Sequence, residues 1–319
     1  MSGMIKSAAV VIFALLLAGC GANEGTDKAA DPNAPLNIVT TTGQVADMVA
    51  NVGGDRVQVQ ALMGPGIDPH LYKASARDVE RLRSADIIFY NGLHLEAKMG
   101  EVIEQLGRTK PVLAVGEAVD PARLISPDAF QRSHDPHIWF DVGLWSQAIP
   151  AVVKILSEKD PTHADDYRER GAEYTAQLAE LNVYVTRQLE TIPPQQRVMI
   201  TAHDAFNYLG RAYGLEVRGL QGISTATEAG TRDVQELAAH IAEQKIPAIF
   251  IESSVSPRAV NAVKEAVKSR GFEVVIGGEI FSDALGNADT PAGTYIGMVR
   301  YNVDTITAAL RGESTGHHE

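Results

Sequence analysis

Short apolar runs rich in β-branched residues alternate with amphipathic stretches along most of this chain. Helical spacing occurs between the runs, as at Val45, Met48, Val49 and Val52. Because alternating strands and helices favour parallel sheets, the pattern predicts two α/β lobes, each with a mostly parallel four-stranded sheet. The predicted strands are Asn37–Thr41, Val57–Leu62, Asp86–Tyr90, Val112–Val115, Val198–Thr201, Glu216–Gly219, Ala248–Ile251 and Glu273–Ile276.

One long helix is predicted between the two groups of strands. Apolar or small residues recur there every three or four positions, at 164, 167, 171, 174, 178, 181, 185 and 189. A helix of about 30 residues is about 45 Å long and makes a stiff connector. A dimeric coiled coil is the alternative interpretation, but the small residues Ala164 and Gly171 in the stripe favour packing against the protein's own lobes. We therefore predict an N-terminal lobe at 36–159, a rigid linking helix at 160–192 and a C-terminal lobe at 193–312.

The N-terminus has the pattern of an export signal. Lys6 precedes the apolar run Ala8–Ala18, which is too short to span a bilayer and suits a signal peptide over residues 1–19. The run leads into Cys20, the only cysteine of the chain. Small residues before a lone cysteine are typical of a bacterial lipobox, so we expect cleavage before Cys20 and a lipid on its sulfur. The alternative is an ordinary secretory signal with an incidental cysteine.

The segments at the two ends of the mature chain are too polar to form a core. Residues 20–35 are rich in Gly, Ala, Asp and Pro and are predicted to be a lipidated flexible tether. Residues 313–319 are predicted to be a disordered tail. We therefore expect an extracytoplasmic protein that is lipid-anchored to a bacterial membrane, in the periplasm or at the cell surface.

Charge and motif content exclude several classes of function. The chain has 28 Lys and Arg against 40 Asp and Glu, and this acidic balance argues against nucleic acid as a partner. The sequence contains no phosphate loop, no Gly-x-Gly-x-x-Gly and no Gly-x-Ser-x-Gly. We therefore do not expect an enzyme of those classes.

The candidates for chemistry are polar residues that follow predicted strands, since parallel α/β sheets bind ligands beyond the carboxyl ends of their strands. His70 follows the second strand, His203 the fifth, and Asp283 comes shortly after the eighth; His137 lies in the loop before a helix that begins near Asp141. His70 and His137 both stand in the tripeptide Asp-Pro-His. Three imidazoles and a carboxylate suit a divalent metal. Spacing alone leaves an alternative open. In it, the histidines are ordinary turn residues and Asp283 only caps a helix.

A set of motifs in chain order carries a resemblance to a known family. They are GPGIDPHLYKAS, NGLHLE, DPHIWFD, TAHDAF, QGISTATEAG, IFIESSVSPR and FSDALG. From about Asn37 to about Leu310 the chain resembles the solute-binding lipoproteins of zinc and manganese ABC transporters, the cluster 9 or TroA-like family. The resemblance implies two α/β lobes joined by one long helix. It also implies metal ligands at the positions of His70, His137, His203 and Asp283.

The resemblance implies capture of one divalent ion and its delivery to an ABC transporter permease for import. Manganese and zinc are the expected cargoes, with iron as a further candidate, and we expect a monomer. Glu228 and Glu252 lie in resembling motifs and could accept hydrogen bonds from ligand imidazoles, or be loop and strand-end charges. The rival functions are a surface adhesin and a metallohydrolase, which would keep a metal position open for water.

Overall fold

The computed structural model describes residues 34–126 and 133–313. The predicted signal peptide, Cys20, nearly all of the tether and the tail from residue 314 lie outside the described residues. The described residues from Pro35 onward belong to one compact unit. None of its described helices is both long and apolar enough to cross a membrane.

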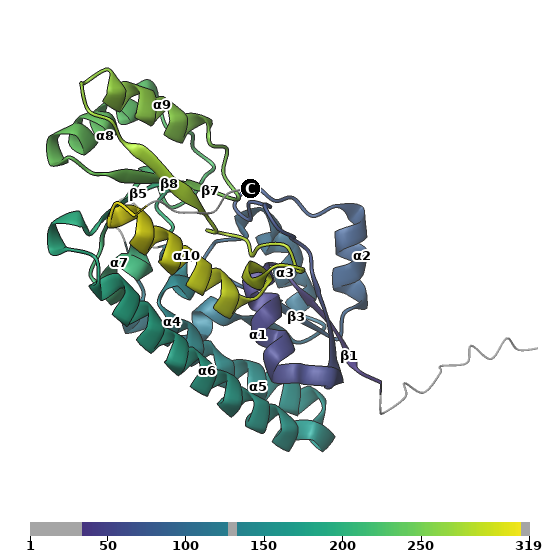
Figure 1. The fold of residues 1–319 in the computed structure, drawn as a ribbon. Helices are drawn as coiled ribbons and strands as arrows, with labels where there is room; N and C mark the ends of the chain where they lie inside the picture. The colour runs from purple at the N-terminus through teal and green to yellow at the C-terminus, as the bar shows by residue number, and fades with distance from the viewer. Residues whose placement is uncertain (1–33, 127–132, 314–319) are drawn as a thin grey trace, which may run out of the picture. The chain divides into compact units, whose positions relative to one another are not determined.

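Four parallel strands form the sheet of the N-terminal lobe, in the order β2-β1-β3-β4 (Figure 1). The strands are β1 (Leu36–Thr40), β2 (Val57–Ala61), β3 (Ile87–Tyr90) and β4 (Val112–Ala114). The helices of this half are α1 (Gly43–Gly53), α2 (Ala76–Ser84), α3 (Gly100–Gly107), α4 (Val142–Trp145) and α5 (Ile149–Lys159). Successive residues of β1 point to opposite faces: Ile38 packs with α1, and Val39 packs with Leu82 of α2 and Ile103 of α3. The sheet therefore has helices on both faces, and its inner strand β3, with the sequence IIFY, is buried along most of its length.

The C-terminal lobe has four strands arranged as two parallel pairs. The strands are β5 (Val198–His203), β6 (Glu216–Gln221), β7 (Ala248–Glu252) and β8 (Val275–Ile280). The helices of this half are α7 (Asn207–Tyr213), α8 (Thr231–Gln244), α9 (Arg258–Lys268) and α10 (Tyr295–Leu310). Strand β5 pairs with β6 and β7 with β8, and β5 lies beside β7.

The division into two pairs refines the prediction of one four-stranded sheet. At the end of β5 the backbone N–H groups of Ala202 and His203 donate to the Glu252 carboxylate, at 2.7 and 3.0 Å. The Glu252 side chain thus accepts hydrogen bonds from N–H groups that, in a continuous sheet, would donate to backbone carbonyls of the neighbouring strand. Strand β8 also starts later than predicted and includes Gly277 and Gly278, with a register shift in its partner at Ile249/Phe250.

The predicted long helix is present as α6 (Ala164–Glu190), 27 residues preceded by a 3-10 turn at Pro161–His163. Seven of the eight predicted stripe positions are buried, and Ala164 is half-buried. The stripe packs against α1, α4 and α5 of one lobe and α7 and α10 of the other (Figure 1). One hydrophobic core therefore runs along the helix through both lobes, from Val45 and Met48 to Met298 and Ile306. The stripe is used within the chain, which disfavours the coiled-coil interpretation.

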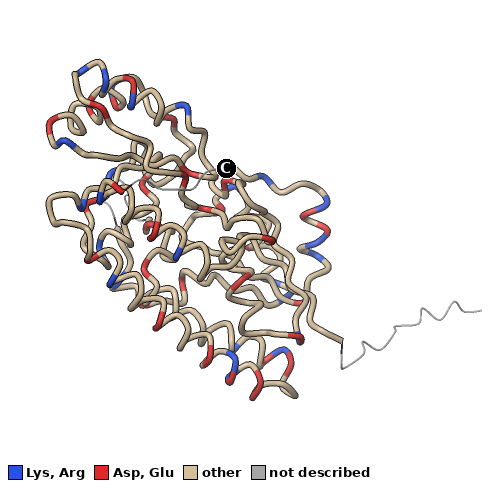
Figure 2. The backbone as a smooth tube through the Cα atoms, viewed as in Figure 1, with Lys and Arg blue, Asp and Glu red and all other residues tan. Residues whose placement is uncertain are grey.

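Charged residues of both signs lie along the outer helices. Figure 2 shows Asp and Glu interspersed with Lys and Arg on α2, α6 and α8. The formal net charge is −12, and acidic residues outnumber basic ones on α6, six to three, and on α8, three to one, whereas α2 carries two acidic and three basic residues. A surface with this excess of acid does not attract a polyanion.

The two strands that carry His203 into place approach closely at Gly219. A Cβ at this position would lie 2.4 Å from both His203 C and Asp204 N, which are backbone atoms that cannot move aside locally. We expect Gly219→Ala to destabilise the protein by about 1–3 kcal/mol, the usual cost of overpacking. Thermal or urea unfolding of the metal-free protein measures this change.

Gly222→Ala is the matched control, since a Cβ there meets nothing within 4 Å and Gly222 lies only three residues further along the same segment. If both variants lost the same stability, the close approach to β5 would not be the reason that position 219 requires glycine. The cause would then be the conformational freedom of glycine.

Candidate metal centre

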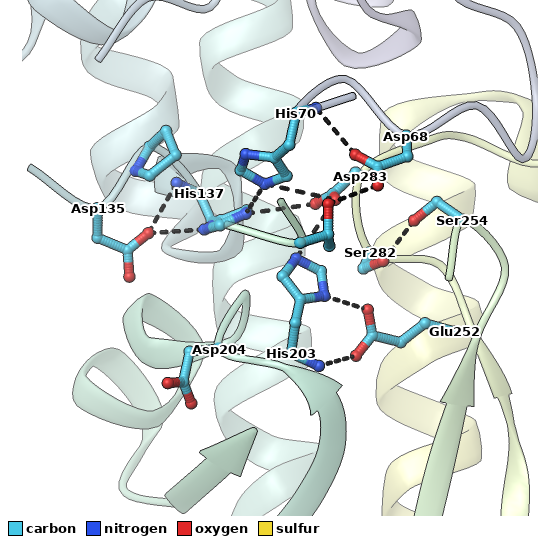
Figure 3. A network of polar contacts seen from close by, with 12 residues as sticks. Asp68, His70, Asp135, His137, His203, Asp204, Glu252, Ser254, Ser282 and Asp283 are labelled. Atoms are coloured by element: carbon cyan, nitrogen blue, oxygen red, sulfur yellow. Dashed lines mark hydrogen bonds and ion pairs between the residues drawn. The ribbon is translucent and has the colours of Figure 1, made fainter. Parts of the chain in front are cut away.

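Four side chains from both lobes meet at one point, three from segments at the carboxyl ends of strands and one from a loop before a helix. His70 comes from the β2–α2 connection, His137 precedes the short turn Ile138–Phe140, His203 is the last residue of β5, and Asp283 follows β8. One donor atom from each lies within 4.8 Å of every other (Figure 3). The structure therefore brings together all four residues that the sequence singled out.

The spacing of the donor atoms matches the edges of a coordination polyhedron. His70 Nε2 lies 3.3 Å from His137 Nε2, and His203 Nε2 lies 3.3 Å from Asp283 Oδ2. Asp283 Oδ1 is 3.4 Å from His137 Nε2, and Asp283 Oδ2 is 3.7 Å from His70 Nε2. With metal–ligand bonds of about 2.0–2.2 Å, tetrahedral edges measure about 3.3–3.6 Å. One cation can therefore lie within bonding distance of all four groups.

The donor atoms are buried and lack other partners. His137 and His203 are 0% exposed, Asp283 is 2% exposed and His70 is 5% exposed. Among the described residues, no hydrogen bond satisfies His203 Nε2 or either oxygen of Asp283. Since leaving a buried polar group unsatisfied costs about 1–3 kcal/mol, and more for a charge, their convergence needs an explanation. Coordination of a cation provides one.

The repeated Asp-Pro-His motif has a structural reason in its aspartate. Asp68 Oδ1 accepts the backbone N–H of His70 at 2.8 Å, and Asp135 Oδ1 accepts that of His137 at 3.0 Å. Each Asp thus closes a turn around its proline and fixes where the histidine backbone lies. Asp135 Oδ1 also lies 2.7 Å from His137 Nδ1, so the Nδ1 proton is held there and Nε2 is directed at the site. The sequence reasoning missed both roles, although the repeated Asp two residues before each His was the available signal.

Glu252 contacts His203 in the same way, which is one of the two roles considered for it. Glu252 Oε2 lies 2.6 Å from His203 Nδ1, while Oε1 accepts two backbone N–H groups at the end of β5. Glu228 does not reach the site: it is exposed between β6 and α8, and no hydrogen bond links it to the four side chains within the described part of the chain. The expectation for Glu228 is therefore corrected. A carboxylate beside a buried imidazole must itself be buried, and Glu252, 3% exposed, meets that condition.

Trp139 forms part of the wall of the site and links it to the other lobe. Its Nε1–H donates to Ser282 O at 3.1 Å, next to Asp283 in the chain, and its ring centroid lies 5.2 Å from that of His137. Tyr295 OH of α10 donates in turn to Trp139 O at 2.6 Å. These contacts fix the backbone that carries Asp283, and the sequence motifs gave no specific signal for them.

The three imidazoles differ in their affinity for protons. Burial lowers the pKa of His70 from 6.5 to about 3, despite the nearby charge of Asp283. Burial acts in the same direction on His137, but the charge of Asp135 and its hydrogen bond, together with Asp283, raise the pKa of His137 to about 9. Burial is likewise outweighed at His203, where Glu252 and Asp283 hold the pKa well above 6.5. Burial would raise the pKa of Asp283, but the charges of His203 and His137 hold it well below 3.8.

Without a cation, the site therefore holds protons that balance its carboxylates. At neutral pH His137 and His203 are charged and Asp283 is ionised, and the proton on each of the two imidazoles must leave before its Nε2 binds a metal.

Comparison with known proteins gives the family. Residues 38–309 match the ZnuA family, described as zinc-uptake complex component A, periplasmic. The chain belongs to this family. The zinc-binding protein TroA of Treponema pallidum is 51% identical over 286 residues, which are 90% of this chain and 92% of TroA. The solved structure of TroA matches with a TM-score of 0.84 and covers 86% of this chain and 99% of that one.

Other relatives of this chain carry the name of a different metal. The manganese-binding lipoprotein MntA of Bacillus subtilis is 46% identical over 304 residues, 95% of this chain and 98% of MntA. PsaA of Streptococcus mitis, a manganese ABC transporter substrate-binding lipoprotein, is 29% identical over 302 residues, 93% of this chain and 95% of PsaA. The family relationship and the TroA-like fold agree with the resemblance found in the motifs.

Replacing Glu252 with glutamine is expected to weaken metal binding by about 10- to 100-fold, the usual effect of losing a carboxylate behind a ligand histidine. The glutamine oxygen can still accept the two backbone N–H groups, but its NH₂ would face His203 Nδ1. His203 would then carry its proton on Nε2, the atom that faces the site. Titration with Zn²⁺ in competition with a chelator measures the change.

Glu228→Gln is the matched control, because this glutamate is exposed and makes no described contact with the site. Unchanged binding in Glu252→Gln, or an equal loss in Glu228→Gln, would contradict the role assigned to Glu252.

Proposed function

We propose that this protein is an extracytoplasmic binding protein that captures one divalent metal ion and delivers it to an ABC transporter for import. The observation that carries the proposal is the convergence of three imidazole Nε2 atoms and both oxygens of a buried carboxylate that has no other partner among the described residues. Their spacing fits one cation in the way a coordination sphere requires. The family, described as a component of a zinc-uptake complex, supports the same function.

The proposed ligands are His70 and His137 of the N-terminal lobe and His203 and Asp283 of the C-terminal lobe. We take the lobes to be 36–159 and 193–312, with 160–192 as the linking segment. Since each lobe supplies two ligands, an ion would join them. A transporter could then distinguish the loaded from the metal-free protein by the relative position of the lobes.

Zinc and manganese are the proposed cargoes. Three nitrogens and a carboxylate bind Zn²⁺ more tightly than Mn²⁺ by the general order of divalent affinities. TroA is named for zinc and MntA for manganese, at 51% and 46% identity, so similarity favours neither strongly. Supply outside the cell and selection by the permease can make the weaker binder the physiological cargo.

Binding and release, and not catalysis, are the proposed use of the ion. A catalytic metal keeps a position open for water beside a general base. Here both oxygens of Asp283 face the imidazoles, Oδ1 toward His137 and Oδ2 toward His70 and His203, which leaves little room for a bound water. The named relatives are metal-binding or transport proteins, and their names do not favour an adhesin.

The proposed location is the outer side of a bacterial membrane, with a lipid on Cys20 and residues 20–35 as tether. The relatives named lipoproteins support an anchor of this kind. The proposed partner is the membrane permease of the transporter, approached by the protein as a monomer. Mass analysis of protein from its native host tests the anchor, since the proposal requires a mature chain that begins at a lipid-modified Cys20.

Calorimetric titration of the metal-free protein with Zn²⁺ and with Mn²⁺ tests the function. We expect one ion per chain and a dissociation constant below about 1 μM, or about −8 kcal/mol, for at least one of the two metals. Competition between them gives the preference, and metal analysis of native protein gives the cargo. Failure of both ions to bind stoichiometrically would refute the proposal.

A further inference from the structure

The three imidazoles of the site are not held equally. His137 Nδ1 is fixed by Asp135 and His203 Nδ1 by Glu252, each within its own lobe. His70 differs, because no hydrogen bond within the described residues holds its Nδ1 (Figure 3). It also lies in the connection of residues 62–75, which contains neither helix nor strand, and it is the most exposed of the three. The position of its ring therefore depends on what holds its backbone.

The backbone of His70 is held by Asp68, which is itself bound by a residue of the opposite lobe. Asp68 accepts the His70 N–H through Oδ1, and its other oxygen accepts the hydroxyl of Thr225 at 2.5 Å. Thr225 is 6% exposed and belongs to the segment between β6 and α8 of the C-terminal lobe. One carboxylate thus connects the backbone of a ligand from the first lobe to a side chain of the second.

We propose that Thr225 is a positioning residue for the metal: through Asp68 it holds His70 in coordinating position only while the lobes are together. His70 is then the ligand that leaves first when the lobes separate, and the Asp68–Thr225 hydrogen bond sets how fast the ion escapes. The neighbouring side chains Ile67 and Leu71 are 40% and 44% exposed, so the released ligand lies on a segment that faces solvent. The inference rests on the proposed function and adds the order in which the ligands act.

The test compares metal release from the full mature chain and its Thr225→Val variant. Valine keeps the shape of threonine and removes the hydroxyl. Zn²⁺-loaded protein is mixed with excess chromogenic chelator, and the rate of release is followed. Hydrogen bonds to charged groups are among the strong ones, so we expect release about tenfold faster, with the association rate and the one-to-one stoichiometry unchanged. Thr225→Ser should restore the slow rate, and Thr227→Val, two residues along and exposed, should not alter it.

A double-mutant cycle separates positioning of His70 from general loosening of the loop. In a His70→Ala background, Thr225→Val should change the Zn²⁺ dissociation constant by less than about twofold, because the ligand that it positions is gone. Asp68→Ala removes the same Asp68–Thr225 hydrogen bond from the side of the N-terminal lobe. Adding Thr225→Val to Asp68→Ala should therefore not increase the rate of metal release further.

Different outcomes would overturn the proposed function and the role of Thr225. Wild-type protein that binds no Zn²⁺ and no Mn²⁺ would overturn the proposed function. Normal binding by wild type with equal release rates in Thr225→Val, or an undiminished effect of Thr225→Val in the His70→Ala background, would overturn this inference alone. Should Thr225→Val fail to fold, Thr225→Ala, with and without His70, decides the same question, because it removes the hydroxyl and keeps the Asp68–His70 hydrogen bond.

Discussion

Replacing His70 with alanine is expected to weaken Zn²⁺ binding by about 100- to 1,000-fold while the fold persists. Four-ligand zinc sites bind with apparent free energies of about 10–16 kcal/mol, so one ligand of four accounts for about 3–4 kcal/mol, and each 1.4 kcal/mol is tenfold. His70 lies in a connection outside the helices and strands, and its neutral imidazole leaves no partner carboxylate unpaired when it is removed. Competition titration gives the affinity, and thermal unfolding of the metal-free protein checks the fold.

His94→Asn is the control for this variant. His94 is an exposed histidine of the same lobe, and its φ of +66° is a conformation that asparagine tolerates better than alanine does. Its binding should equal that of wild type. Tight stoichiometric binding by His70→Ala would show that His70 is not a ligand. The N-terminal lobe would then supply only one of the proposed ligands.

Metal affinity is expected to rise by about 100-fold per pH unit between about pH 5 and pH 8. His137, with a pKa of about 9, and His203, with a pKa well above 6.5, both carry a proton in this range when no metal is bound. His70, with a pKa of about 3, carries none, and Asp283 is already ionised. Binding therefore releases two protons, and raising the pH favours it until His137 loses its proton in the metal-free state near pH 9.

This dependence extends to higher pH than the sequence suggests. Histidines with an ordinary pKa of about 6.5 would make the affinity nearly independent of pH above about 7.5. Calorimetry in buffers of different ionisation enthalpy counts the protons directly, and we expect about two at pH 7. Asp135→Asn should reduce the count to about one, because the carboxylate that raises the pKa of His137 is gone. A count near zero in wild type would show that the imidazoles are already neutral without metal.

Much of the architecture was predictable because it depends on local patterns. All eight predicted strands are present, with ends that differ by a few residues, and the three-and-four spacing of apolar positions located α6. The sheet of the C-terminal lobe was less predictable. Its division into two pairs is accompanied by a tertiary contact, in which the Glu252 side chain accepts two backbone N–H groups at the end of β5, from residues about 50 positions away.

The candidate residues were also accessible from the sequence, but their partners were only partly so. His70, His203 and Asp283 follow strands, and the rule that ligands lie beyond strand ends selects such positions. His137 lies in a loop before a helix, and its signal was the repeated Asp-Pro-His motif and the family resemblance. Glu228 satisfied the same motif criterion as Glu252 and yet lies exposed. A motif gives the order of residues along the chain, whereas burial depends on which segments fold over them.

The sequence by itself determined the alternation of strands and helices, the connecting helix, and the types of side chain available at the strand ends, since these depend on periodicity and residue chemistry. Only the tertiary structure decided that the donor atoms lie within 4.8 Å of one another, four pairs of them 3.3–3.7 Å apart, and that Thr225 of the opposite lobe supports His70 through Asp68. It also decided which imidazoles hold protons. Distances, burial and mutual charge arise from segments far apart in the chain, and no local pattern encodes them.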